Sequence, residues 1–260
     1  MSASPEVVKI KSSRVHDVSP PLAYEAALGA TRMVYTQPNK DSRLVFVTEP
    51  CGLAVEQYKL LRRRLCALHP GGGILMISSP GPGEGKTLTA VNLAWCLADG
   101  GSATVIVDLD FREPAVASTL RHCFESGVED VLAGSRTLSE SLYKLGDRPL
   151  HVLGITKALD SMSVHLTSSS LTSLFADLSA RFSWIIVDVP PVLPLADVAE
   201  LIPHVDGAIL VVRARKTAQP VIAPALEILG TKLWGVILND APIIGDSYGY
   251  GAYKGRYGKR

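Results

Sequence analysis

The stretch that decides the fold is ILMISSPGPGEGKT, residues 74–87. Ile74 to Ile77 form a short continuous apolar run, which is typical of a buried strand. The glycine-rich loop that follows leads into Thr87 to Ala98, where apolar residues recur at helical spacing. Because such a loop turns backbone N–H groups inward and a helix N-terminus adds partial positive charge, the stretch predicts a phosphate-binding loop.

The loop holds the residue types that bind a nucleoside triphosphate together with Mg²⁺. Glycines let the backbone approach phosphate oxygens, Lys86 would reach the β- and γ-phosphates, and the Thr87 hydroxyl would hold the metal ion. Pro80 stands six residues before the lysine, where the strict pattern has glycine, and the alternative interpretation is a structural glycine-rich turn. The residues predicted to bind the nucleotide are Gly81, Gly83, Glu84, Gly85, Lys86, Thr87, Leu88 and Asn239.

Apolar runs further along the chain predict the rest of the sheet. They cover Thr104–Val107, Trp184–Val187, Ala208–Val212 and Trp234–Leu238, with helical segments between them. Runs of this kind suit parallel strands that are covered on both faces, so we expect an α/β fold with a doubly wound, mostly parallel sheet in a single domain. A further helix is expected over Val55–Ala67, before the first strand.

Two segments fall outside this pattern. Residues 1–50 are polar, with several prolines and no sustained period, and predict an N-terminal extension to a domain at 51–240. Residues 241–260 are rich in glycine and poor in apolar groups, which predicts a flexible, disordered tail. Half of the chain's eight tyrosines lie in this tail, an enrichment that no hydrophobic core explains: Tyr248, Tyr250, Tyr253 and Tyr257.

Carboxylates follow two of the predicted strands. Asp108 and Asp110 come directly after one apolar run, and Asp188 follows another. Because ligands bind at the carboxyl ends of the strands in this architecture, we expect these groups at the rim near the phosphate loop. A single aspartate in such a position is usually a turn or helix cap. Two of them after a phosphate loop favour a Mg²⁺ site formed by Thr87, Asp110 and Asp188.

Composition excludes several classes of protein. The 26 basic and 25 acidic side chains provide no broad basic field for a polyanion. No apolar run approaches the roughly 18 residues that span a bilayer, and residues 1–21 lack the apolar stretch of a signal peptide. We therefore expect a cytoplasmic protein that reaches the membrane only through a partner. The four cysteines are far apart, without a CxxC pair, and predict neither a metal site nor a disulfide framework.

With these motifs the chain resembles the bacterial tyrosine autokinases (BY-kinases) of capsule and exopolysaccharide export, within the P-loop NTPases. In that family the phosphate loop is followed by three aliphatics and D-x-D-x-R, as in Val105–Arg112, and by aliphatics and Asp, as in Ile185–Asp188. A C-terminal tyrosine cluster completes the pattern. The resemblance covers roughly residues 50 to 260.

The resemblance implies a protein-tyrosine kinase that transfers phosphate from ATP, with Mg²⁺, to its own tail tyrosines. It makes Lys86, Asp108, Asp110 and Asp188 the catalytic residues, with Asp108 accepting the phenol proton. It also implies a transmembrane polysaccharide co-polymerase as activator, a homo-oligomer, a protein-tyrosine phosphatase, and recruitment to the inner face of the membrane. Each phosphate would add about −1.5 to −2 charges, so a few would reverse the tail's charge of +3 (Lys254, Arg256, Lys259 and Arg260 against Asp246).

The family carries E-x-x-R-x-x-R for subunit contacts on the helix before the sheet. Glu56, Lys59 and Arg62 have this spacing, with lysine in place of the first arginine. Lysine keeps the charge and loses the bidentate fork. The alternative interpretation is an intrahelical Glu56–Lys59 pair on a solvated face.

Other functions remain open at this point. A partitioning ATPase of the ParA/MinD type would have a second lysine at the position of Gly81, and an ATP-binding scaffold would need no transfer step. A nucleic-acid-binding tail is disfavoured by its small net charge, so we expect no nucleic acid partner. Asn239 ends the last strand at the ligand rim, where it either contacts the nucleotide base or is only a turn residue. Arg112 pairs with a carboxylate or places the acceptor.

Overall fold

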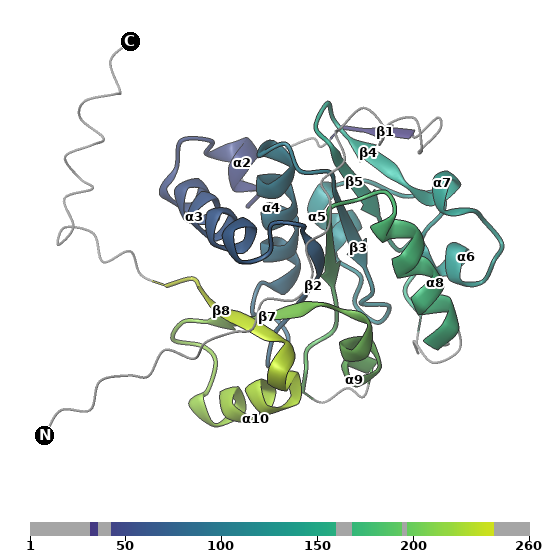
Figure 1. Ribbon diagram of the computed structural model, residues 1–260. Coiled ribbons are helices and arrows are strands. Elements are labelled where there is room, and N and C mark those ends of the chain that lie inside the picture. The colour runs from purple at the N-terminus through teal and green to yellow at the C-terminus, as the bar shows by residue number, and fades with distance from the viewer. Residues whose placement is uncertain (1–31, 36–42, 160–167, 194–196, 242–260) are drawn as a thin grey trace, which may run out of the picture.

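The computed structural model describes residues 32–35, 43–159, 168–193 and 197–241. They form an eight-stranded sheet in the order β1-β4-β5-β3-β6-β2-β7-β8, covered by helices on both faces (Figure 1). All pairs are parallel except β4 with β5. The predicted doubly wound, mostly parallel fold is confirmed.

The strands are β1 (Arg32–Val34), β2 (Gly73–Ser78), β3 (Thr104–Asp108), β4 (Tyr143–Leu145), β5 (Leu150–Leu153), β6 (Trp184–Asp188), β7 (Gly207–Arg213) and β8 (Leu233–Asn239). The helices are α2 (Val45–Thr48), α3 (Leu53–Leu68), α4 (Lys86–Asp99), α5 (Val116–Leu120), α6 (Val128–Leu132), α7 (Leu138–Ser141), α8 (Ser168–Ser179), α9 (Asp197–Leu201) and α10 (Gln219–Leu229), with short 3₁₀ segments at Ile202–His204 and Gly230–Lys232.

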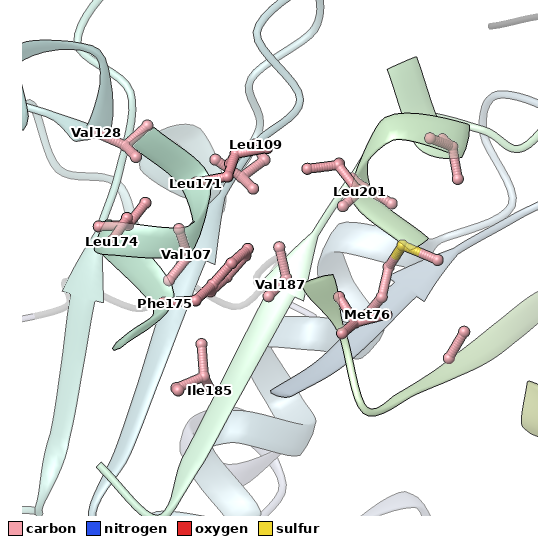
Figure 2. Close-up of a cluster of buried hydrophobic side chains, with 14 of the residues drawn as sticks. Met76, Val107, Leu109, Val128, Leu171, Leu174, Phe175, Ile185, Val187 and Leu201 are labelled. Carbon is pink, nitrogen blue, oxygen red and sulfur yellow. The ribbon is translucent and has the colours of Figure 1, made fainter. Parts of the chain in front are cut away.

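The central strands are apolar along their whole length because both of their faces are covered. In β3, Val105 and Val107 point to one face of the sheet and Ile106 to the other, as the two-residue period of a strand requires. Figure 2 shows Phe175 of α8 lying over Val107 and Ile185. Each fully buried large apolar side chain stabilises the folded state by about 1.5–3 kcal/mol relative to an exposed one. The many side chains buried on both faces therefore hold the sheet in place beneath the loops at its rim.

The opposite face is covered by α4, which packs on the sheet, and by α3, which packs on α4. Nearly every residue of α4 after its first turn is buried, since the helix lies between the sheet and α3 (Figure 1). The predicted helices over Val55–Ala67 and Thr87–Ala98 are confirmed within two residues at each end. The core therefore fixes α4, and with it the residues of its first turn, Lys86 and Thr87.

Parts of the predicted N-terminal extension pack on the domain. β1 extends the sheet beside β4, and Val34 and Leu44 are buried among core residues. The boundaries 1–50, 51–240 and 241–260 otherwise stay predictions, and residues 242–260 lie outside the described ranges. Among the described residues, no helix combines the length and the apolar character needed to cross a bilayer.

Candidate functional site: a phosphate loop beside buried carboxylates

The glycine-rich loop connects the carboxyl end of β2 to the first turn of α4. Gly83 has φ of 73° and Gly85, the residue before α4, has φ of 92°. A side chain is strained in this left-handed region, and a Cβ on Gly85 would also overlap the amide nitrogen of Asn239. Both glycines are thus required by the backbone path that brings the loop round the N-terminus of α4.

Lys86 lies between two of the predicted carboxylates. Its Nζ is 2.6 Å from Asp110 Oδ2 and 3.8 Å from Asp188 Oδ1. Burial lowers the pKa of Lys86, but the charges of Asp188 and Asp110 outweigh it, so the pKa is raised overall. Nζ also lies 3.4 Å from the Thr87 hydroxyl. The structure therefore brings Lys86, Thr87, Asp110 and Asp188 together, as the sequence predicts.

Asp108 and Asp188 end neighbouring strands and are register partners across β3 and β6. Asp108 is saturated: Oδ1 accepts from the Asp110 N–H at 3.0 Å, and Oδ2 accepts from the N–H groups of Ala115 and Val116 at 3.2 and 3.1 Å. No donor among the described residues makes a hydrogen bond to either oxygen of Asp188, although both are fully buried; the Thr87 hydroxyl and the Lys86 ammonium are only near enough to lower its pKa. Buried polar atoms are nearly always partnered, so Asp188 is an open acceptor.

Both carboxylates have raised pKa values. Burial, followed by the charge of Asp188, raises the pKa of Asp108 to about 8, against the opposing effect of the Val116 and Asp110 backbone N–H groups. Burial raises the pKa of Asp188 to about 6, against the opposing effect of the Lys86 charge. Strongly shifted groups of this kind concentrate at functional sites.

The oxygen atoms around Lys86 suit Mg²⁺. Mg²⁺ takes oxygen ligands and is usually bound through one or two protein groups, several waters and phosphate oxygens. The open carboxylate of Asp188 and the buried hydroxyl of Thr87 supply such ligands. No group of three or more His, Cys, Asp or Glu side chains with metal-binding geometry occurs in the described part of the chain. The residues present therefore fit Mg²⁺ bound together with phosphate, rather than an all-protein metal cage.

Glu84 and Asn239 connect the loop to the last two strands. Glu84 Oε2 accepts from the Arg213 N–H at 2.6 Å and from the Thr217 hydroxyl, and the Glu84 carbonyl accepts from Asn239 Nδ2 at 2.8 Å. The side chain and the carbonyl of Glu84 are thus used within the protein, and its backbone N–H is the part left for a ligand. Asn239 contacts the loop itself, which the sequence analysis did not foresee. The Arg213–Thr217 turn was also missed, although β7 ends at the same rim as the loop.

The remaining predicted residues lie around this centre. Gly81 lines a hollow of about 290 Å³ beside the loop, whose lining is Pro80, Gly81, Pro82, Glu84, Leu193, Lys216, Thr217, Ala218 and Val221. Leu88, in the first turn of α4, packs its side chain against the core, so the side chain itself is directed to the protein interior. Arg112 is exposed. The four predicted acceptor tyrosines lie outside the described residues.

The predicted subunit-contact residues lie on α3, away from this site. Lys59 Nζ is 2.8 Å from Glu56 Oε1, so the intrahelical pair that was the alternative interpretation does form. Arg62 Nη1 donates to the Cys96 carbonyl at 2.9 Å, near the C-terminal end of α4. A subunit contact through Glu56, Lys59 and Arg62 stays a prediction.

Comparison with known proteins decides the family. The family model described as an AAA domain matches residues 73–227. The tyrosine-protein kinase YwqD of Bacillus subtilis (strain 168) is 31% identical over 222 residues, which are 82% of this chain and 94% of that protein. The chain belongs to the bacterial tyrosine kinase family.

Other relatives of the chain extend the comparison. The crystal structure of the chimerical protein CapA2B2 superposes with a TM-score of 0.73 at 26% identity, over 85% of this chain and 98% of the other. The succinoglycan biosynthesis transport protein ExoP of Rhizobium meliloti (strain 1021) is 26% identical over 72% of this chain and 25% of its own length. The resemblance inferred from the motifs is confirmed, and so is the P-loop nucleotide-binding domain.

Proposed function

We propose that this chain is an ATP-dependent protein-tyrosine autokinase that phosphorylates Tyr248, Tyr250, Tyr253 and Tyr257 and regulates exopolysaccharide or capsule synthesis and export. The observation that carries the proposal is the open, buried carboxylate of Asp188 beside Lys86 at the end of the phosphate loop. Family membership supports tyrosine as the acceptor, and a relative named for succinoglycan biosynthesis supports the polysaccharide role.

Lys86 changes partner when the nucleotide binds, in this proposal. The ammonium that now contacts Asp110 would reach the β- and γ-phosphates. Thr87 and Asp188 would hold Mg²⁺, with Asp110 adding negative charge nearby; bound Mg²⁺ neutralises the charge that develops on the phosphates. Phosphoryl transfer depends mainly on positioning and charge stabilisation, which makes Lys86 and Asp188 more important than any proton acceptor.

Asp108 has two proposed roles. Its three backbone N–H bonds hold the segment from Asp110 to Val116 against the end of β3, which positions Asp110. The family resemblance adds acceptance of the phenol proton, for which a pKa of about 8 lies near neutral pH. Removing the proton acceptor without unfolding the segment separates the two roles, as described in the Discussion.

The position of β8 supports the tail as substrate. β8 runs parallel to β7 and ends at Asn239, which contacts the phosphate loop. The tail therefore begins beside the proposed nucleotide site. An extended chain spans up to about 3.4 Å per residue, so Tyr248 to Tyr257 have the length to reach this site or that of a neighbouring subunit. We further propose a homo-oligomer, a transmembrane activator that recruits the chain to the inner face of the membrane, and a tyrosine phosphatase as partners.

Radiolabelled ATP tests the proposal. The wild-type chain should incorporate label into tyrosine with Mg²⁺, and Lys86→Met and a variant with the four tail tyrosines changed to phenylalanine should both lose it. Tyr35→Phe, which removes an exposed tyrosine outside the tail, is the matched control and should keep it. Because Lys86→Met leaves two buried carboxylates without their cation, its folding is checked by circular dichroism, and Lys86→Arg is measured beside it.

The same assay distinguishes the alternatives. Release of free phosphate without phosphotyrosine would identify an ATPase, and nucleotide binding without either product would identify a scaffold. Either result contradicts the proposed kinase.

A further inference from the structure

A tight turn after β7 brings a lysine over the phosphate loop. The Arg213 carbonyl accepts from the N–H groups of Lys216 and Thr217 at 3.3 and 3.1 Å. Arg215 has φ of 62°. This left-handed conformation is energetically unfavourable for any residue other than glycine. Such strain persists only where the surroundings fix the backbone, so the direction in which Lys216 leaves the turn is imposed by the fold.

The surroundings that fix the turn belong to the phosphate loop. The Glu84 carboxylate accepts from the Arg213 N–H and the Thr217 hydroxyl, on either side of Lys216. The Gly83 carbonyl accepts from Arg213 Nη1 at 3.3 Å. Hydrogen bonds from both backbone and side-chain groups thus connect the turn to the phosphate loop. They fix the position of the Lys216 backbone relative to the loop.

The ammonium of Lys216 lies against the loop backbone. A Cβ on Gly83 would be 3.3 Å from Lys216 Nζ, which is closer than ordinary contact distance, so the ammonium lies directly against the loop at a residue without a side chain. Lys216 shares the lining of the 290 Å³ hollow with Gly81, which has no side chain to offer a ligand there. A cation at this distance from a loop of inward-facing N–H groups adds to their attraction for an anion.

In the described part of the chain, Lys216 lacks the acidic partner that Arg213, at the other end of the turn, has. Arg213 is neutralised by Asp240, at 2.6 Å from Nη2. The side chain of Lys216 makes no ion pair or hydrogen bond with the described residues and is exposed. A positive charge that lies beside a phosphate loop without a protein counter-ion among the described residues is available to a ligand.

We propose that Lys216 binds the phosphates of the nucleotide in this loop, as a second cation besides Lys86, and so sets affinity for the polyphosphate. The inference rests on the proposed function only in that the loop binds a nucleoside triphosphate; it does not require transfer to tyrosine. Lys216 is a binding residue in this proposal: it contacts the phosphates and takes no part in bond making.

Calorimetric titration of the full chain with Mg²⁺-ATP, Mg²⁺-ADP and adenosine tests this inference. A hydrogen bond to a charged group is worth about 1.5–3 kcal/mol, so Lys216→Ala should raise the Kd for ATP roughly tenfold or more at low salt. The effect should shrink at high salt and be absent for adenosine, which has no phosphate. Lys216→Arg should restore most of the affinity, since it keeps the charge.

Two controls separate this role from a structural one. Arg64→Ala removes an exposed cation from α3 and should leave the Kd for ATP unchanged. The unfolding midpoint of Lys216→Ala should equal that of the wild type. An unchanged Kd for ATP in Lys216→Ala, or an equal loss for ATP and adenosine, overturns the inference.

The outcome is independent of the kinase assay. If Lys216→Ala binds ATP like the wild type while phosphotyrosine forms, the inference fails and the proposed function stands. If Lys216 affects ATP affinity but no phosphotyrosine forms, the reverse holds. Absence of nucleotide binding by the wild-type chain overturns both.

Discussion

The ends of β3 and β6 carry the same chemical group in two opposite environments. Asp108 and Asp188 are register partners at the same rim, each after a run of buried aliphatics, and both are fully buried. Asp108 accepts three backbone N–H bonds, and Asp188 accepts none among the described residues. One carboxylate organises the protein, and the other is left for what the protein binds.

The residues that follow each strand explain the difference. After Asp108 the chain turns back as a loop and the short helix α5, whose first N–H groups lack partners within the helix and donate to Asp108. After Asp188 come Val189, whose N–H donates to the Ile77 carbonyl, and then Pro190 and Pro191, which have no N–H. The backbone beside Asp188 therefore has no donor to give it. The two prolines thus leave the Asp188 carboxylate without a backbone donor from the residues that follow it.

The sharpest way to break this comparison is Asp188→Asn, for which we expect the largest effect. If Asp188 serves a ligand, autophosphorylation should fall by roughly 100-fold or more, the size of losing one group that stabilises transition-state charge. The free energy of unfolding should change little, because the 3.8 Å ion pair with Lys86 that is lost is offset by the removal of a buried charge, while Lys86 keeps Asp110 at 2.6 Å. Initial rates of phosphotyrosine formation and urea unfolding without nucleotide measure the two quantities. A destabilised variant with normal activity would show that Asp188 is structural after all.

Asp108→Asn should give the complementary result. The amide has one acceptor oxygen for three N–H donors, so at least one buried donor loses its partner, which costs about 1–3 kcal/mol. We expect the free energy of unfolding in urea to fall by this amount. Activity, measured well below the unfolding midpoint, tests the second proposed role. A rate equal to that of the wild type would exclude Asp108 as the proton acceptor and leave only its positioning role.

Much of this site was predictable from the sequence, and there is a physical reason why the remaining parts of the fold and the site were not. Continuous apolar runs such as Ile185–Val187 reveal buried parallel strands, and the loop motif reveals what lies at their ends. β4 and β5 were missed because they have only three and four residues, and because Lys144 and His151 interrupt their apolar residues. Short antiparallel pairs offer little periodicity to detect.

Contacts between distant segments were beyond the sequence. Glu84 belongs to the loop motif, yet its carboxylate holds the turn at Arg213–Thr217, some 130 positions away in the chain. Nothing in the spacing of residues indicates that β7 and the loop come together until the strand order is known. The proline pair after Asp188, by contrast, was present in the sequence as a signal that the carboxylate would stay open.

The pH dependence of stability sharpens the comparison with a smaller effect. The pKa of Asp188 rises on folding from 3.8 to about 6, and that of Asp108 to about 8. A raised carboxylate pKa means that the folded state binds the proton more tightly, so its stabilising effect is complete below pH 4 and is lost as pH rises through the folded pKa.

We therefore expect the nucleotide-free chain to lose stability between pH 4 and pH 8. In Asp188→Asn the loss between pH 4 and pH 6 should be smaller, by on the order of 1 kcal/mol per pH unit. Burial lowers the pKa of His69 and gives a contribution of the opposite sign, lost as pH falls below 6.5, but it is the same in both proteins and cancels in their difference. Urea unfolding of both proteins across this range measures that difference. Parallel curves would mean that Asp188 carries no buried charge in the folded protein, and the contrast between the two strand ends would then lie in hydrogen bonding alone.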